Sequence, residues 1–294
     1  MSWENLRQRL VQAWAKRTAR PGFRKINEFL FDCAVHGLGI LNYENDLISG
    51  ELHFVKNLLP MYTLGRQPLI FDVGANEGGY ARMVFRQFPQ AVIYAFEPNP
   101  RTFAVLDKEF GSKINTINAG LGAAKSRLTL YDRADFDGMS QHASLYREVI
   151  TDLHHAQSVE IDVDVFTVDD FVAEHGLTEP ISLLKIDTEG HELEVLKGAR
   201  KTIERGLVDL VHVEFNEMNV VSRVFCRDLR EMLPDYVPFR LLQDGVLRLS
   251  TYPLTSELFA YQNIVFVNNR FWPNSAMEPT VRHPKRKTFE SEDV

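Results

Sequence analysis

The 294-residue chain has only two cysteines, Cys33 and Cys226, and neither belongs to a CxxC pair. A disulfide framework or a thiolate zinc site is therefore not expected. The sequence also lacks hydrophobic runs of the roughly 20 residues that a bilayer span needs, because charged side chains interrupt every candidate run. It has no charged stretch followed by the apolar core of a secretory signal, so we expect a protein of the reducing cytoplasm.

The sequence lacks the excess of basic residues that is typical of a nucleic-acid-binding protein. Asp and Glu outnumber Lys and Arg by 40 to 33, which leaves a net charge of −7. Binding dominated by phosphate contacts is disfavoured by this balance, so nucleic acid is not an expected partner. The charge is nevertheless uneven: residues 1–25 carry +6 and the remainder −13. The sequence thus combines a basic amino-terminal arm with an acidic body.

The arm itself has a helical pattern. Apolar residues recur at helical spacing from Trp3 to Trp14, which predicts an amphipathic helix over 3–17 that ends before Pro21. A second helical stretch is expected over 24–36. Two tryptophans among basic residues suggest the hypothesis of peripheral contact with a membrane surface. The alternative is a helix that packs on its own domain or on a partner subunit.

From Pro68 onward, short apolar runs alternate with helical segments, which is typical of an α/β fold with a mostly parallel sheet and helices on both faces. The strands expected in this sheet are 69–73, 91–96, 114–119, 181–186, 208–215 and 264–267. Helices are expected over 79–88, 101–110, 193–204 and 222–233. Further strands are expected at 128–131, at 159–165 and in a hairpin with an Asp244-Gly245 turn. The resulting domain plan is a helical extension (1–60), one catalytic-type domain (61–272) and a disordered tail rich in proline and charge (273–294).

The first informative motif is a glycine turn that follows a buried strand. The strand ends near Asp72, and a turn with Gly74 and Gly78 leads into a helix, where free N–H groups favour anionic ligand atoms. Glu97 ends the next strand, at the offset where an acid binds ribose hydroxyls in nucleotide-type α/β folds. Asn76 occupies the place of the second glycine of a dinucleotide motif, which disfavours a nicotinamide cofactor. S-adenosylmethionine has no pyrophosphate and carries positive charge, so it suits this acidic turn.

A second motif, Asp187-Thr188-Glu189-Gly190-His191-Glu192, follows the strand at 181–186. Together with the segments 72–80 and 97–99, it resembles the FkbM-type family of S-adenosylmethionine-dependent methyltransferases. The resemblance covers about residues 42–267 and includes the segment 49–51, Asn118 and the segment 167–170. Outside this range it says nothing about the arm.

The resemblance implies a class I methyltransferase fold, Rossmann-like, with about seven strands and the last one antiparallel. It also implies methyl transfer to a hydroxyl of a sugar, glycolipid or natural product, so the expected partner is a hydroxylated small molecule or glycan. By position, the residues implied to hold the amino-acid part of the cofactor are Asp72, Gly74, Ala75, Asn76, Gly78 and Tyr80. Those implied to lie around the ribose and adenine are Glu97, Pro98, Asn99, Asn118 and Ala119.

Methyl transfer to a hydroxyl also needs a group that accepts the proton. Four candidates follow adjacent strands: Asp187, Glu189, His191 and Glu214. We predict His191 as the base, with Asp187 or Glu189 as its orienting partner. The alternative makes a carboxylate the base and lets His191 bind the acceptor. Asp187, Glu189 and Glu214 would also suit a Mg²⁺ ion, although acids before a helix have a simpler explanation in the helix dipole, so a divalent metal is not favoured.

Two other functions remain open from the sequence alone. One is methylation of nucleic acid, which the acidic body opposes and for which the usual Asn/Asp-Pro-Pro-aromatic run is missing. The other is a catalytically silent nucleoside-binding scaffold that the basic arm recruits to anionic lipid. Asp72, Glu97 and the 187–192 motif argue against a silent protein.

Overall fold

The computed structural model describes residues 2–133, 143–153 and 155–271. The described part of the chain divides into two compact units, one within Met1–Val35 and one within His36–Trp272. The tail predicted at 273–294 lies outside the described residues. All of the candidate site residues belong to the unit His36–Trp272.

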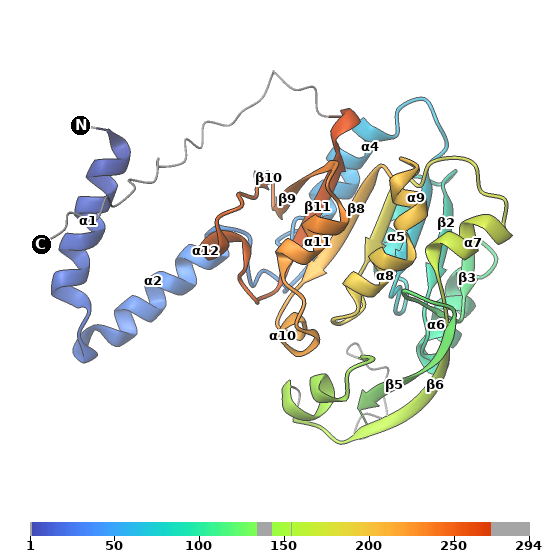
Figure 1. Cartoon of the computed structure of the whole chain (residues 1–294), viewed down its shortest axis with the longest axis horizontal. Helices are drawn as coiled ribbons and strands as arrows, with labels where there is room; N and C mark the ends of the chain where they lie inside the picture. The colour runs from blue at the N-terminus through green and yellow to red at the C-terminus, as the bar shows by residue number, and fades with distance from the viewer. Residues whose placement is uncertain (1, 134–142, 154, 272–294) are drawn as a thin grey trace, which may run out of the picture. The chain divides into compact units, whose positions relative to one another are not determined.

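This unit is built around an eight-stranded sheet with the order β10-β9-β11-β8-β7-β1-β2-β3 (Figure 1). The five strands from β8 to β3 are parallel, and β11, β9 and β10 follow in antiparallel pairs. The strand bounds are β1 (Leu69–Val73), β2 (Val92–Phe96), β3 (Asn115–Ile117), β7 (Leu183–Ile186), β8 (Leu210–Phe215), β9 (Tyr236–Leu242), β10 (Gly245–Arg248) and β11 (Gln262–Asn268). The predicted mostly parallel α/β fold is confirmed.

The eighth strand, β10, comes from the predicted hairpin. Its turn is shifted by one residue from the prediction: Gly245 already pairs with Leu242, so Gln243 and Asp244 form the loop. The strand predicted over 114–119 is also shorter, because the chain leaves the sheet after Ile117. At that point it crosses into a second, smaller sheet.

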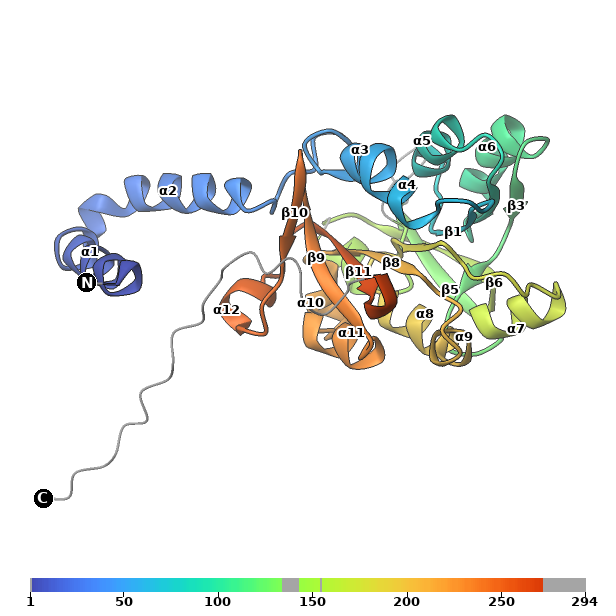
Figure 2. The same cartoon turned by 90° about the horizontal axis from the view of Figure 1, so that it is seen from above.

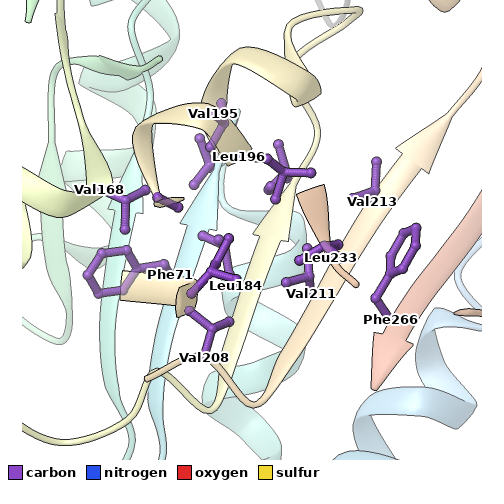
Figure 3. Packing of buried hydrophobic residues seen from close by; sticks show 14 of the residues in the cluster. Phe71, Val168, Leu184, Val195, Leu196, Val208, Val211, Val213, Leu233 and Phe266 are labelled. Atoms are coloured by element: carbon purple, nitrogen blue, oxygen red, sulfur yellow. The ribbon is translucent and has the colours of Figure 1, made fainter. Parts of the chain in front are cut away.

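Helices cover the sheet on both faces (Figure 2). On one face lie α3 (Glu51–His53), η2 (Phe54–Leu58), α4 (Leu59–Tyr62), α5 (Gly79–Gln87) and α6 (Pro100–Phe110). On the other lie α7 (Val168–Glu174), α8 (Glu192–Gly198), α9 (Arg200–Glu204) and α11 (Cys226–Met232), while α10 (Met218–Ser222) and α12 (Pro253–Ser256) are short helices in the connections around the antiparallel strands. Figure 3 shows the core beneath α8, where Val195 and Leu196 pack toward Leu184 and Val211. Burial on both faces explains why the central strands have almost continuous apolar sequences.

Two of the expected helices differ from the prediction, one because it is interrupted and one because it starts later. The expected helix over 193–204 breaks between α8 and α9, because the carboxylate of Asp169 accepts the N–H groups of Lys201 and Thr202 and so caps a new helix start. The expected helix over 222–233 is preceded by the separate turn of α10 and begins only at Cys226.

The expected boundary near residue 60 does not match the division of the chain. Phe54, Val55 and Leu59 are buried and belong to the same hydrophobic cluster as Ile70 of β1. This apolar contact makes residues 36–62 part of the larger unit, so the arm ends near Val35.

The second sheet has three strands in the order β4-β6-β5. It consists of β4 (Gly120–Leu121), β5 (Ser126–Arg133) and β6 (Ser158–Phe166), and η3 (Val149–Leu153) lies in the connection between β5 and β6. The strands predicted at 128–131 and 159–165 are confirmed, and they pair with each other along their length.

The unit Met1–Val35 contains α1 (Trp3–Thr18) and η1 (Pro21–Phe23), and α2 (Arg24–Gly37) begins in it. The hydroxyl of Ser2 accepts a hydrogen bond from the Asn5 N–H at 3.4 Å, so α1 starts with a serine cap. Among the described helices, none is long and apolar enough to cross a membrane.

Gly198 fixes how closely α8 approaches the small sheet. A Cβ added to Gly198 would lie 2.0 Å from the carbonyl oxygen of Gly122, which follows β4. We therefore expect Gly198→Ala to push these segments apart and to lower the free energy of unfolding by about 2 kcal/mol or more. Urea denaturation measures the change. Gly245→Ala is the matched control, since its Cβ would meet nothing within 4 Å; equal stability of the two variants would contradict the prediction.

Candidate active site

The site forms where the parallel strands β1, β2 and β7 end side by side. Val73 pairs with Phe96 on one side and with Ile186 on the other, so the next residues of the three strands meet. Gly74 has a φ of 79°, and a Cβ there would lie 1.8 Å from the carbonyl oxygen of Asp187. Only glycine permits this approach of two backbones, which explains the glycine at this turn.

Two adjoining cavities open at these strand ends. The first, called here the His191 cavity, is lined by Glu97, Pro98, Leu121 and His191 among others. The second, the Glu214 cavity, is lined by Glu51, Lys185 and Glu214 among others. The residues that line both are Gly74, Asn76 and Asp187. One elongated ligand can therefore lie across the strand ends with a part in each cavity.

Glu97 is held at the rim of the His191 cavity by backbone hydrogen bonds. Its two carboxylate oxygens accept the N–H of Asn76 at 2.9 Å and that of Asn99 at 2.8 Å. Burial raises the pKa of Glu97 to about 7, and the two N–H groups act against that rise. A buried acid fixed in this way presents its remaining lone pairs to a ligand in a defined direction.

The Glu214 cavity is strongly acidic and contains one buried cation. Lys185 donates a hydrogen bond to Asp187 at 2.7 Å. Burial lowers the pKa of Lys185, but Asp187, Asp72 and Glu51 outweigh this and raise it, so the lysine is charged. Burial also raises the pKa of Glu51 to about 7 and that of Glu214 well above its usual range. A ligand with a cationic group would relieve the mutual repulsion of these acids.

His191 lies at the start of α8 in the His191 cavity. Burial lowers the pKa of its imidazole, so the ring is neutral near pH 7. Its Nδ1 is buried and has no hydrogen-bond partner among the described residues. The predicted pairing with Asp187 is not formed, because Lys185 takes the Asp187 carboxylate, and the charged neighbours that affect the pKa of His191 are Glu194 and Lys197.

Glu192 shapes the loop that carries these residues. Its buried carboxylate accepts the N–H and hydroxyl of Thr188, the N–H of Gly190 and, on its other oxygen, the side-chain amide of Asn219. The loop takes a left-handed backbone, with φ of 53° at Glu189 and 105° at Gly190. Because residues with side chains rarely adopt this conformation, these hydrogen bonds hold the loop in a strained form.

Residues 143–148, which precede η3, contact the loop. Ser144 donates its hydroxyl to the carbonyl oxygen of Glu189 at 2.8 Å, and the ring of Tyr146 lies 6.1 Å from that of His191. Asp132 of β5 accepts the side-chain amide of Asn99 at 2.9 Å. The small sheet is thus attached to both sides of the His191 cavity.

The structure brings most of the predicted site residues together, but not all of them line the cavities. Those on the cavity walls are Gly74, Ala75, Asn76, Tyr80, Glu97, Pro98, Asp187, Glu189, His191 and Glu214. The others support the walls. Asp72 lies buried in β1 beside Lys185, Gly78 and Asn99 begin α5 and α6, and Asn118 donates to the carbonyl oxygens of Glu97 and Pro98. Ala119 is buried just before β4, after Asn118.

The acids considered for Mg²⁺ are arranged differently from a metal site. Asp187 is paired with Lys185, and Glu214 accepts the side-chain amide of Asn216 at 2.9 Å. Throughout the part of the chain that the structure describes, no three His, Cys, Asp or Glu side chains form a group that would hold a metal ion.

Sequence reasoning missed three residues of the site: Glu51, Lys185 and Glu192. The sequence does contain a signal for Lys185, because a lysine in an otherwise apolar central strand needs a buried partner. Glu192 belongs to the motif, but its carboxylate turns into the loop, and the spacing does not show this. Glu51 reaches the site through the packing of α3 on the sheet, which only the tertiary structure shows.

We expect Glu192→Ala to lower the free energy of unfolding by about 3 kcal/mol, because it removes a buried charged acceptor from several donors. Chemical denaturation checks this. Glu194→Ala is the matched control from the same helical turn. Its ion pair with Lys197 lies near the surface, so its loss should change stability by less than about 1 kcal/mol. A Glu192 variant as stable as the Glu194 variant would show that the loop does not depend on this carboxylate.

Several known methyltransferases are similar in sequence to this chain. Methyltransferase sdnD of Sordaria araneosa is 32% identical over 184 residues, which cover 54% of this chain and 70% of that protein. The 2-O-methyltransferase NoeI of Sinorhizobium fredii is 24% identical, with 58% of this chain and 72% of that protein covered. The hexuronic acid methyltransferase AglP of Haloferax volcanii is 28% identical, with 58% and 64% covered. The profile of the Methyltransferase FkbM domain matches residues 72–237, more than half of the chain, and the chain therefore belongs to the FkbM methyltransferase family.

Proposed function

We propose that this chain is an S-adenosylmethionine-dependent O-methyltransferase that acts on a hydroxyl of a sugar, glycolipid or natural product. The observation that carries the proposal is that Glu97 and His191 line one cavity, which meets the acidic Glu214 cavity at Gly74 and Asp187. In this proposal Glu97 binds the ribose, His191 is the base, and the Glu214 cavity takes the cationic part of the cofactor.

The residues of both cavities suit this cofactor. Glu97 would accept the ribose hydroxyls, and Pro98 with Leu121 gives the His191 cavity apolar surface for the adenine. Asn76 has a buried side-chain oxygen with no hydrogen-bond partner among the described residues, and it lies where both cavities meet. The acids of the Glu214 cavity would hold the amino-acid part, with Lys185 for its carboxylate. When bound, S-adenosylmethionine supplies an electrophilic methyl group.

The protein's own task is to place the acceptor and remove its proton. His191 accepts the proton that the acceptor hydroxyl loses as the new oxygen–carbon bond forms. The buried, neutral imidazole is ready for this without a prior proton loss. The Ser144 and Glu192 hydrogen bonds keep the loop beneath His191 in place, and Leu121 and Leu130 of the small sheet line the cavity.

The relatives support an acceptor of the hydroxylated kind. The names of NoeI and AglP describe a 2-O-methyltransferase and a hexuronic acid methyltransferase. The direct test is a screen of hydroxylated acceptors with labelled methyl donor, run with and without a chelator. Transfer to a hydroxyl supports the proposal, and failure to bind S-adenosylhomocysteine would remove it.

Glu97→Ala should weaken the binding of S-adenosylhomocysteine by about 10- to 100-fold, because hydrogen bonds to a carboxylate contribute about 1.5–3 kcal/mol. Glu97→Gln keeps one acceptor oxygen and should fall between this variant and the parent. Isothermal titration calorimetry measures the affinity. The control is Glu174→Ala, an exposed acid of α7. An unchanged affinity in Glu97→Ala would place the ribose elsewhere.

His191→Gln should lower kcat by about 10²–10⁴-fold, the usual contribution of a general base. The parent enzyme should lose activity as the pH falls through the lowered pKa of His191, below its ordinary value of 6.5, since protonation removes the base. The variant should lack this acidic limb in a profile of kcat against pH. If KM rises while kcat and its pH profile stay unchanged, His191 binds the acceptor and a carboxylate is the base.

A further inference from the structure

We propose that the amino-terminal arm, defined here as α1 and the first half of α2, binds the surface of membranes that contain anionic lipid. The arm is separate from the active-site unit in the division of the chain, and the FkbM match begins only at residue 72. Methyl transfer therefore does not account for it. The proposal does not depend on the proposed function, because membrane binding is measured without acceptor or cofactor.

The first observation is an uncovered apolar stripe on α1. Trp3, Leu6, Leu10 and Trp14 fall within an arc of about 80° at 3.6 residues per turn. All four side chains are exposed, with Trp3 at 72% and Trp14 at 47%. A folded protein rarely leaves such a stripe in water, and tryptophan at both ends suits the boundary between headgroups and acyl chains.

The second observation is the placement of the basic residues. On the same helical projection, Arg7 borders one edge of the stripe, and Arg9 and Lys16 border the other. Among the described residues, Arg7, Lys16 and Arg17 form no ion pair. A helix that lies with its stripe in the membrane would bring these charges to the level of the lipid phosphates.

The apolar surface continues on α2. Ile26, Phe29 and Leu30 recur at helical spacing and are exposed, with Phe29 at 63%. Most of the basic residues lie on α1 and in the turn after it, and Arg24 of α2 is paired with Glu28 at 2.6 Å. The arm thus offers two apolar helical faces and one strongly basic region.

The positive charge of the arm favours a lipid surface over a second copy of the arm as the partner that covers the apolar stripe. Residues 1–25 carry +6, so two arms that pack face to face would repel each other. An anionic bilayer instead gains about 1 kcal/mol for each Lys or Arg near its surface, or about fivefold in partitioning. The apolar stripe adds burial that does not depend on lipid charge.

The test is co-sedimentation of the full chain with vesicles of phosphatidylcholine alone or with about 30% phosphatidylglycerol, a content chosen to set a negative surface potential. We expect binding to the anionic vesicles that weakens as salt is added. Replacing both Arg7 and Lys16 by Gln should weaken it by about 25-fold at low salt. Trp3→Ser with Trp14→Ser should weaken binding by about tenfold or more even at high salt.

The matched control is the double variant Lys201→Gln with Arg205→Gln, which removes two exposed charges from the unit His36–Trp272. This variant should bind vesicles as the parent does. Circular dichroism and the unfolding curve of each variant show that the folded unit is intact. Equal binding to neutral and anionic vesicles, or none to either, would overturn the proposal. So would light scattering that shows a dimer in the parent and a monomer in the tryptophan variant, since a second copy would then cover the stripe.

Discussion

The site depends on one close approach, that of the backbone at Gly74 to the carbonyl oxygen of Asp187. Two parallel strands end there in register, and the distance leaves no room for a Cβ. This contact brings the glycine turn and the 187–192 loop next to each other. The positions of Glu97, Lys185 and His191 depend on it, because these residues come from the strands and loops on either side.

The ionisable groups differ between the Glu214 cavity and the His191 cavity. On one side, carboxyl groups crowd around a single buried lysine, so that burial and repulsion hold the pKa values of Glu51, Asp72 and Glu214 high. On the other side, burial lowers the pKa of His191, so its ring is neutral near pH 7. A cationic cofactor and a neutral acceptor hydroxyl would each find the environment that suits it.

Much of this was predictable from the sequence because it depends on local patterns. The apolar strands, the glycine turn and Glu97 at its offset follow from strand and turn chemistry, and the structure confirms their placement. The predicted orienting partner of His191 is Asp187 or Glu189, and of these two Asp187 accepts a hydrogen bond from Lys185, which lies two residues earlier in β7. The division of the small sheet from the large one was also not predictable, since β5 and β6 have ordinary strand sequences and only their partners separate them. Whether His191 is the base stays a prediction.

The most direct test is the crystal structure of the chain with S-adenosylhomocysteine bound. We expect a nucleoside that lies across the ends of β1, β2 and β7, with its ribose hydroxyls on the Glu97 carboxylate and its amino-acid part in the cavity with Lys185 and Glu214. The sulfur should lie near Gly74 and Asp187, on the side that opens toward His191. A nucleoside bound outside these cavities, or one whose sulfur is separated from His191 by other residues, would contradict the proposed function.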